Sequence, residues 1–257
     1  MEQKHFVLVH GVCHGAWCWF KLKTRLELAG HKVTALDLAA SGINTKKIED
    51  VHTFYEYSEP LLEFMASLGP NEKVILVGHS FGGLTLALAM DKFPQKIALA
   101  VFVAAFVPDT HHKPSYVLEE LNKRYQISTG SSDAQLNSSR GGKTTFLFDP
   151  QLLSTNLYQL CSPEDLELAK TLTRTGSLFL EDLSEANNFS KEGYGYVPSA
   201  YIVCSEDLII PLEYQKWMIQ NAGIDKVREI KGSDHMAMLS KPQELCSSLV
   251  ELTEKHA

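Results

Sequence analysis

The 257-residue chain has no apolar run that approaches the roughly 20 residues needed to cross a membrane. The first five residues lead directly into a strand pattern and lack the apolar core of a secretion signal. Cysteine is scarce, and five cysteines at irregular spacing do not suit a disulfide framework. We therefore expect reduced thiols and a cytoplasmic protein.

Basic residues are also too few to form a binding surface for polyanions. The 24 Lys and Arg are outnumbered by 31 Asp and Glu, and they are scattered without a stripe. We therefore expect neither nucleic acid nor a membrane as a partner. The sequence contains no GxGxxG and no phosphate-binding loop, so we expect no nucleotide, flavin or other cofactor.

Short apolar runs alternate with helical patterns at both ends of the chain. This alternation predicts an α/β protein with a doubly wound, mostly parallel sheet of about six strands. The expected strands are 5–10, 32–37, 73–77, 98–107, 200–204 and 227–230. The expected helices between them are 16–28, 54–68, 84–93, 212–221 and 242–256.

The alternation stops in the middle of the chain, where small polar residues dominate. Only helical pieces are recognisable there, at 116–125, 150–160 and 163–173, the last with Ser162 as its expected N-cap. We therefore predict an α/β core formed by 1–107 and 189–257, with 108–188 inserted as a helical cap.

The strongest motif is Gly78-His79-Ser80-Phe81-Gly82, which joins an apolar β-branched run to a helical pattern. Strand, Gly-x-Ser-x-Gly and helix in this order are typical of a nucleophile elbow, although an ordinary Gly-rich turn has the same composition. The glycines leave room for a tight turn that presents the hydroxyl of Ser80. Ser80 is therefore the candidate nucleophile, and the turn is expected to direct the ring of His79 elsewhere.

A serine nucleophile needs a histidine base and an acid that orients it. His235 lies in a loop between the last expected strand and the last helix, which is where this architecture places the base. Glu206 and Asp207 both follow the strand 200–204, and the pattern does not decide between them. The shorter side chain favours Asp207, with Glu206 as a surface charge and Asp234 as a turn residue.

Two backbone donors are needed for an oxyanion hole. The N–H of Phe81 follows the nucleophile directly, and Val12 lies in the loop after the first strand, where Gly11 and Gly15 permit close approach of a substrate.

The same loop also contains residues that can bind metals. Their spacing matches no standard zinc pattern and no second ligand pair completes a tetrahedron, so we expect no metal site. These residues are His10, Cys13, His14 and Cys18.

With these residues placed, the chain closely resembles the plant methylesterase family of α/β-hydrolases over nearly its whole length. The resemblance rests on the segments 5–23, 72–83 and 230–239, among others. It implies the α/β-hydrolase fold with a small cap over the serine. It also implies Ser80, Asp207 and His235 as the triad, which supports Asp207 over Glu206, and the N–H groups of Val12 and Phe81 as oxyanion donors.

The resemblance implies a serine carboxylesterase that acts on a small apolar methyl ester of a plant hormone or alkaloid. Hydroxynitrile lyases resemble the same family, but they tend to carry Thr where this chain has Gly11 and Lys where it has Met236. A ligand receptor that turns over slowly on the same fold is the other alternative. The sequence leaves a homodimer open.

The substrate pocket is expected to combine cap residues with residues next to the triad. The cap from about 126 to 145 departs most from the family, so the resemblance does not name one ester. The expected pocket residues are Gly11, Phe146, Phe148, Leu152, Tyr158, Phe179 and Met236.

Overall fold

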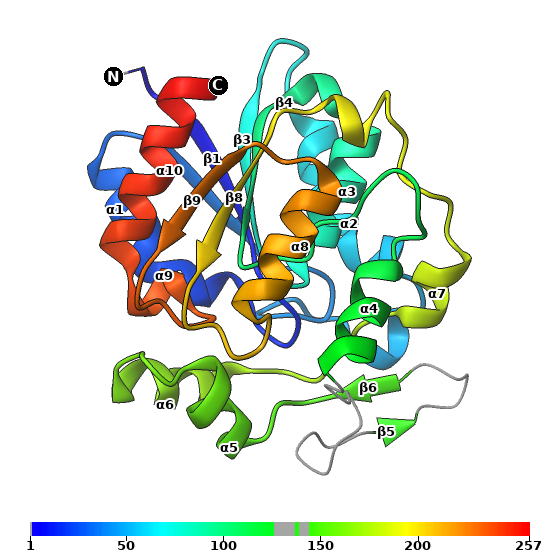
Figure 1. Cartoon of the computed structure of the whole chain (residues 1–257), viewed down its shortest axis with the longest axis vertical. Coiled ribbons are helices and arrows are strands. Elements are labelled where there is room, and N and C mark those ends of the chain that lie inside the picture. The colour runs from blue at the N-terminus through cyan, green and yellow to red at the C-terminus, as the bar shows by residue number, and fades with distance from the viewer. Residues whose placement is uncertain (1, 126–136, 139–143) are drawn as a thin grey trace.

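The computed structural model describes residues 2–125, 137–138 and 144–257 and has an α/β architecture (Figure 1). Its main sheet has six parallel strands, which confirms the predicted parallel sheet of about six strands, and their order is β2-β1-β3-β4-β8-β9. The strands are β1 (His5–Val9), β2 (Lys32–Leu36), β3 (Val74–His79), β4 (Ile97–Val103), β8 (Ser199–Cys204) and β9 (Lys226–Ile230).

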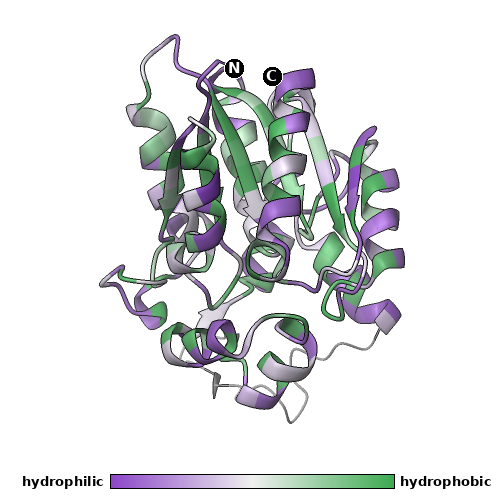
Figure 2. Ribbon diagram, turned by 90° about the vertical axis from the view of Figure 1, so that its left-hand side faces the viewer, coloured by the Kyte–Doolittle hydropathy of each residue, from purple (hydrophilic) through white to green (hydrophobic). Residues whose placement is uncertain are grey.

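Helices cover both faces of this sheet because successive strand residues point to opposite sides. In β1, Phe6 and Leu8 pack in the core beneath one helical layer, and Val7 and Val9 pack beneath the other. The central strands are mostly hydrophobic, whereas the helices carry hydrophilic outer faces (Figure 2). The edge strand β9 is more hydrophilic, since it carries Lys226, Arg228 and Glu229. One layer contains α1 (Phe20–Leu28) and α10 (Pro242–His256), and the other contains α2 (Phe54–Ser67), α3 (Gly82–Lys92) and α8 (Leu212–Ala222).

Two elements differ from their expected bounds. The expected helix 16–28 begins as a 3₁₀ turn, Ala16–Trp19, before α1. The strand expected at 98–107 ends at Val103, because Ala104 has a left-handed φ of 42° and the chain turns towards the elbow. There Phe106 N–H donates to Ser80 O at 3.0 Å, so the last apolar residues of this run form a loop beside the serine.

The segment 108–188 contains helices that lie beyond the carboxyl ends of the strands (Figure 1). Ser162 accepts a hydrogen bond from Asp165 N–H and caps the third of them, as expected. The helices are α4 (Tyr116–Tyr125), α5 (Pro150–Leu152) continued by the π-turn Leu153–Leu157, α6 (Pro163–Leu172) and α7 (Leu180–Glu185).

A small antiparallel sheet accompanies these helices, which the expectation of a purely helical cap did not include. It consists of β5 (Asn137–Ser138), β6 (Thr144–Phe146) and β7 (Gly176–Ser177). Strands of two or three residues carry no recognisable alternation, so the sequence pattern could not reveal them. The boundaries of the cap at 108 and 188 stay a prediction, and most of the segment expected to be unusual, 126–145, lies outside the described residues.

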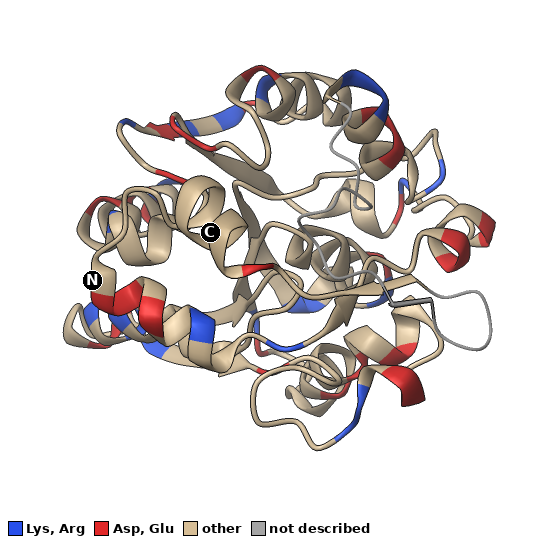
Figure 3. Ribbon diagram, turned by 90° about the horizontal axis from the view of Figure 1, so that it is seen from below, with Lys and Arg blue, Asp and Glu red and all other residues tan. Residues whose placement is uncertain are grey.

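Charged residues are dispersed over the outer elements, with Lys and Arg interspersed among Asp and Glu (Figure 3). All five cysteines are free thiols. Within the described ranges, no helix combines the length and the apolar composition that a bilayer crossing requires.

The contact between α3 and the loop after β4 gives a test of the fold around the elbow. A Cβ on Gly83 would lie 2.1 Å from the backbone oxygen of Phe106, whereas one on Gly195 would have no neighbour closer than 3.5 Å. We expect Gly83→Ala to destabilise the protein by about 2 kcal/mol or more, because backbone must move. Gly195→Ala is the matched control and should change the free energy of unfolding by less than about 0.5 kcal/mol. Urea unfolding measures both, and equal stabilities would contradict this packing.

Candidate active site

Ser80 lies at the turn between β3 and α3 with a left-handed φ of 53°. Such a backbone conformation is strained in a non-glycine residue and persists only where the surroundings hold it. Here the carbonyl oxygen of Ser80 accepts hydrogen bonds from the N–H groups of Gly83, at 3.1 Å, and Phe106, at 3.0 Å. The elbow predicted from the motif is therefore formed, and its serine reaches a cavity.

His235 and Asp207 lie side by side after the neighbouring strands β9 and β8. The distance between His235 Nδ1 and Asp207 Oδ2 is 2.7 Å, and both side chains are buried. Because a carboxylate only accepts, Nδ1 carries the proton and Nε2 is left as the basic nitrogen. Asp207 Oδ1 accepts the N–H groups of Ile209 and Ile210, both at 2.8 Å, which fixes the carboxylate.

The structure separates the two carboxylates that the strand pattern could not rank. Asp207 is buried against His235, whereas Glu206 is exposed. The backbone of Glu206 is held by Ser233 O and by the side chain of Gln159, and its carboxylate lies outside the cavity lining.

Ser80 and His235 line the same cavity, with Val12 and Phe81 beside the serine. No hydrogen bond joins Ser80 Oγ to His235 among the described residues. The two side chains are placed together by the cavity that both of them line. In the described part of the chain, the N–H groups of Val12 and Phe81 have no protein acceptor. Two free donors next to the start of α3 suit a developing negative charge.

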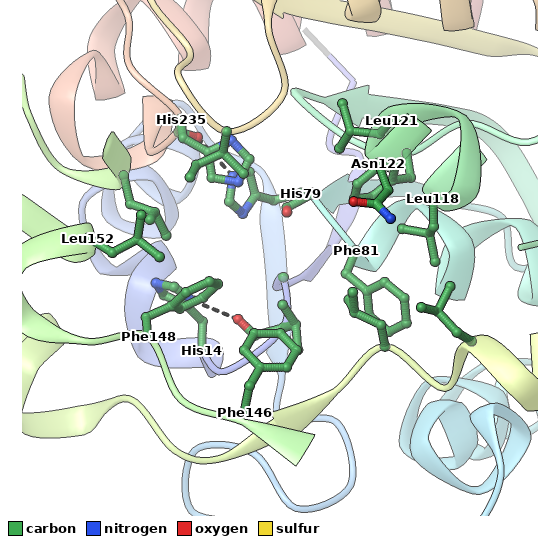
Figure 4. Close-up of a pocket in the computed structure, with 18 of the residues that line it drawn as sticks. His14, His79, Phe81, Leu118, Leu121, Asn122, Phe146, Phe148, Leu152 and His235 are labelled. Atoms are coloured by element: carbon green, nitrogen blue, oxygen red, sulfur yellow. Dashed lines mark hydrogen bonds between the residues drawn. The ribbon is translucent and has the colours of Figure 1, made fainter. Parts of the chain in front are cut away.

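The cavity has a volume of about 280 Å³ and mostly apolar walls (Figure 4). Phe148 and Leu152 lie on one side, and Leu118 and Leu121 of α4 lie on the other. Four of the expected pocket residues line it: Gly11, Phe146, Phe148 and Leu152.

The other three expected pocket residues are outside the cavity lining, which corrects the prediction. Tyr158 instead donates its hydroxyl to His14 Nε2 at 2.7 Å. Phe179 packs against Tyr57, with ring centroids 5.3 Å apart. Met236 is fully buried in the core behind the site.

Several lining residues were missed by the sequence analysis. Leu118 and Leu121 are three apart on the expected helix 116–125, so its apolar face was the signal that could have found them. Ile209 follows the acid in a loop and carried no such signal. The remaining missed side chains are His14, His79, Phe106, Glu119, Asn122, Leu157, Leu178 and Leu180.

His79 lines the cavity, so the expectation that its ring points elsewhere is wrong. Its ring centroid lies 4.5 Å from that of His235, and its Nε2–H donates to His235 O at 2.8 Å. Burial and the neighbouring imidazole of His235 hold the pKa of His79 well below its ordinary value. Burial lowers the pKa of His14 to about 4. Both imidazoles are therefore uncharged at neutral pH.

The metal-capable residues of the first loop are engaged in other contacts. His10 Nδ1 donates to Gly11 O at 2.7 Å, and its Nε2 accepts Leu38 N–H at 3.1 Å. Burial raises the pKa of the Cys13 thiol to about 12, which opposes the thiolate that a metal would need. Among the residues that the structure describes, no group of three or more His, Cys, Asp or Glu could hold a metal ion.

Comparisons with known proteins agree with this geometry. A family model described as alpha/beta hydrolase fold matches residues 4–242. The chain is 56% identical to Salicylic acid-binding protein 2 of Nicotiana tabacum, with 99% of both chains covered. It is 52% identical to Methylesterase 1 of Arabidopsis thaliana, over 99% of this chain and 97% of the relative.

A solved structure shows the same likeness in three dimensions. The crystal structure of polyneuridine aldehyde esterase superposes with a TM-score of 0.95 at 51% identity, covering 98% of this chain and 100% of that one. The same protein from Rauvolfia serpentina is 51% identical in the sequence comparison, over 98% of this chain and 97% of the relative.

The contact between His235 and Asp207 predicts contrasting effects of two substitutions. Asp207→Asn should lower kcat for a p-nitrophenyl ester by roughly 10²–10⁴-fold, because the imidazole loses the acceptor that orients it. Glu206→Gln should stay within about twofold, because that carboxylate is exposed and outside the cavity. Steady-state kinetics of the two purified variants measure this, and the reverse order would assign the acid to Glu206.

Proposed function

The chain belongs to the alpha/beta hydrolase fold family and, within it, to the plant methylesterases, and on this premise we propose that Ser80, His235 and Asp207 carry out ester hydrolysis. It is a carboxylic ester hydrolase. The observation that carries the residue assignment is the 2.7 Å contact between His235 and Asp207 at a cavity that also contains the strained Ser80.

In the proposed mechanism, His235 Nε2 takes the proton of Ser80 Oγ as the oxygen attacks the ester carbonyl. The carbonyl oxygen becomes negative and is stabilised by the free N–H groups of Val12 and Phe81. The imidazolium then gives its proton to the departing methanol, which leaves an acyl-enzyme on Ser80. Water activated by His235 hydrolyses this intermediate and restores the serine.

The substrate we propose is the methyl ester of a compact, apolar acid. The cavity is small, and aromatic and aliphatic side chains form most of its walls, which suits an aromatic or alicyclic acyl group. One relative is named for binding salicylic acid and another as an esterase of polyneuridine aldehyde. Hormone esters such as methyl salicylate or methyl jasmonate and alkaloid methyl esters are therefore the candidates.

Two positions argue against hydroxynitrile lyase chemistry, which needs a group to stabilise departing cyanide. Gly11 provides no hydroxyl, and a Cβ there would lie 2.9 Å from Ser80 Cβ, so a side chain would press on the nucleophile. Met236 provides only a thioether and is fully buried outside the cavity. Neither position supplies an ammonium or hydroxyl to the reacting atoms.

Removal of the nucleophile tests the proposed function. Ser80→Ala should lower methanol release from the best substrate by at least about 10⁴-fold, because no other group forms the acyl-enzyme. Methyl salicylate, methyl jasmonate, methyl indole-3-acetate and an alkaloid methyl ester are assayed for methanol with both proteins.

Circular dichroism and thermal unfolding confirm that the variant is folded. A Ser80→Ala protein that keeps a tenth of the activity would rule out the serine mechanism. Tight binding of one ester without Ser80-dependent turnover would instead identify a ligand receptor.

The lyase alternative has its own test. We expect no cyanide release from mandelonitrile or acetone cyanohydrin above the uncatalysed rate, because no Lys or Arg of the described residues lines the cavity to stabilise the leaving cyanide. Cyanide is measured with the unmodified protein and with Ser80→Ala as the background. Robust release that depends on Ser80 would overturn the esterase assignment.

A further inference from the structure

The turn formed by residues 158–161, here called the cap turn, is bonded to both loops that carry the proposed acid and base. The side-chain amide of Gln159 donates to Glu206 O at 2.7 Å. The backbone N–H of Leu160 donates to Asp234 Oδ2 at 2.9 Å. Glu206 and Asp234 immediately precede the proposed acid and base, respectively. The cap turn therefore binds the residue that precedes Asp207 and the residue that precedes His235.

Asp234 accepts four hydrogen bonds, two of them from the cap turn. Its side chain is fully buried, and both of its oxygens are occupied. Oδ1 accepts Met236 N–H at 3.1 Å, just before α9 (Ala237–Ser240), and Ser240 Oγ–H at 2.6 Å, at the end of that helix. Oδ2 accepts Leu160 N–H and, at 3.3 Å, the thiol of Cys161. All four partners are donors, which suits a carboxylate.

The carboxylate of Asp234 therefore connects two segments of the chain. Oδ1 stabilises the loop after β9 through its bonds to Met236 and Ser240, and Oδ2 binds the cap turn. A buried carboxylate with satisfied hydrogen bonds resists displacement, since each lost bond leaves an unpaired polar group away from water. The next residue is His235, whose Nδ1 must stay 2.7 Å from Asp207 Oδ2.

We propose that Asp234 is a positioning residue for His235. By binding the cap turn, Asp234 makes the orientation of the His235 imidazole against Asp207 depend on the position of the cap turn. The inference rests on the proposed function of His235 as the base. It replaces the interpretation of Asp234 as an ordinary turn residue, which accounts only for the contacts of Oδ1.

A purely structural role for Asp234 makes a different prediction about the kinetics. If His235 drifts from Asp207, turnover at each active site slows while KM changes little, because the cavity walls stay in place. A substitution that only destabilises the fold reduces the amount of active enzyme and leaves kcat per active site unchanged.

The test compares Asp234→Asn with Ser240→Ala in the full chain. Asn keeps the size of the side chain but cannot accept at both ends, so it places an amide donor against the cap turn or against α9. We expect kcat to fall about 10- to 100-fold with KM within about twofold, because the imidazole is misplaced while the cavity walls remain. Ser240→Ala removes one bond to Oδ1 and keeps the cap turn, so its kcat should stay within about threefold.

Rates are measured with p-nitrophenyl acetate at one fixed pH and divided by the active-site concentration from burst titration. An unchanged kcat in Asp234→Asn would overturn the inference. If that variant does not fold, Gln159→Ala with Cys161→Ala leaves Asp234 in place and should lower kcat by at least about threefold with KM within about twofold. An unchanged kcat in this double variant would also overturn it. Ser80→Ala is assayed alongside, and activity that survives in it would refute the proposed function instead.

Discussion

The hydrogen bond between His235 Nδ1 and Asp207 Oδ2 is the interaction on which the site depends, and the register of the sheet sets it. β8 and β9 are adjacent and parallel, with Cys204 opposite Ile230, so the loops that follow them emerge at the same edge. Asp207 lies three residues beyond Cys204 and His235 lies five beyond Ile230. A shift of register by one residue would turn both loops and separate the pair.

Burial gives this pair an environment suited to acyl transfer. The imidazoles of His14 and His79 flank the cavity, but their depressed pKa values keep them uncharged at neutral pH. Around the serine, the walls are mostly apolar and the free backbone donors are those of Val12 and Phe81. In such surroundings, fixed dipoles stabilise a developing oxyanion far more than they would in water.

The cap completes the site from two directions. Its apolar side chains form much of the cavity wall, and its turn at 158–161 reaches the loops of the acid and the base. Arg174 adds a further connection, since its guanidinium donates to the backbone oxygens of Gly42, Asn44 and Lys46 in the core. The segment 108–188 is thus bonded to the loops of Asp207 and His235 and to the backbone at 42–46.

The sequence by itself determined the alternating strands and helices, the elbow at Ser80 and the placement of His235, because these depend on local spacing and periodicity. The bounds of α10, for example, are those predicted. It could not choose between Glu206 and Asp207 without a resemblance to a known family. Only the tertiary structure decided that Leu118 and Ile209 line the cavity while Phe179 and Met236 lie behind it. It also turned Tyr158 towards His14, 144 residues away, and Asp234 towards the cap turn. Such contacts join segments far apart in the chain, and which side of a wall a residue occupies follows from how those segments pack.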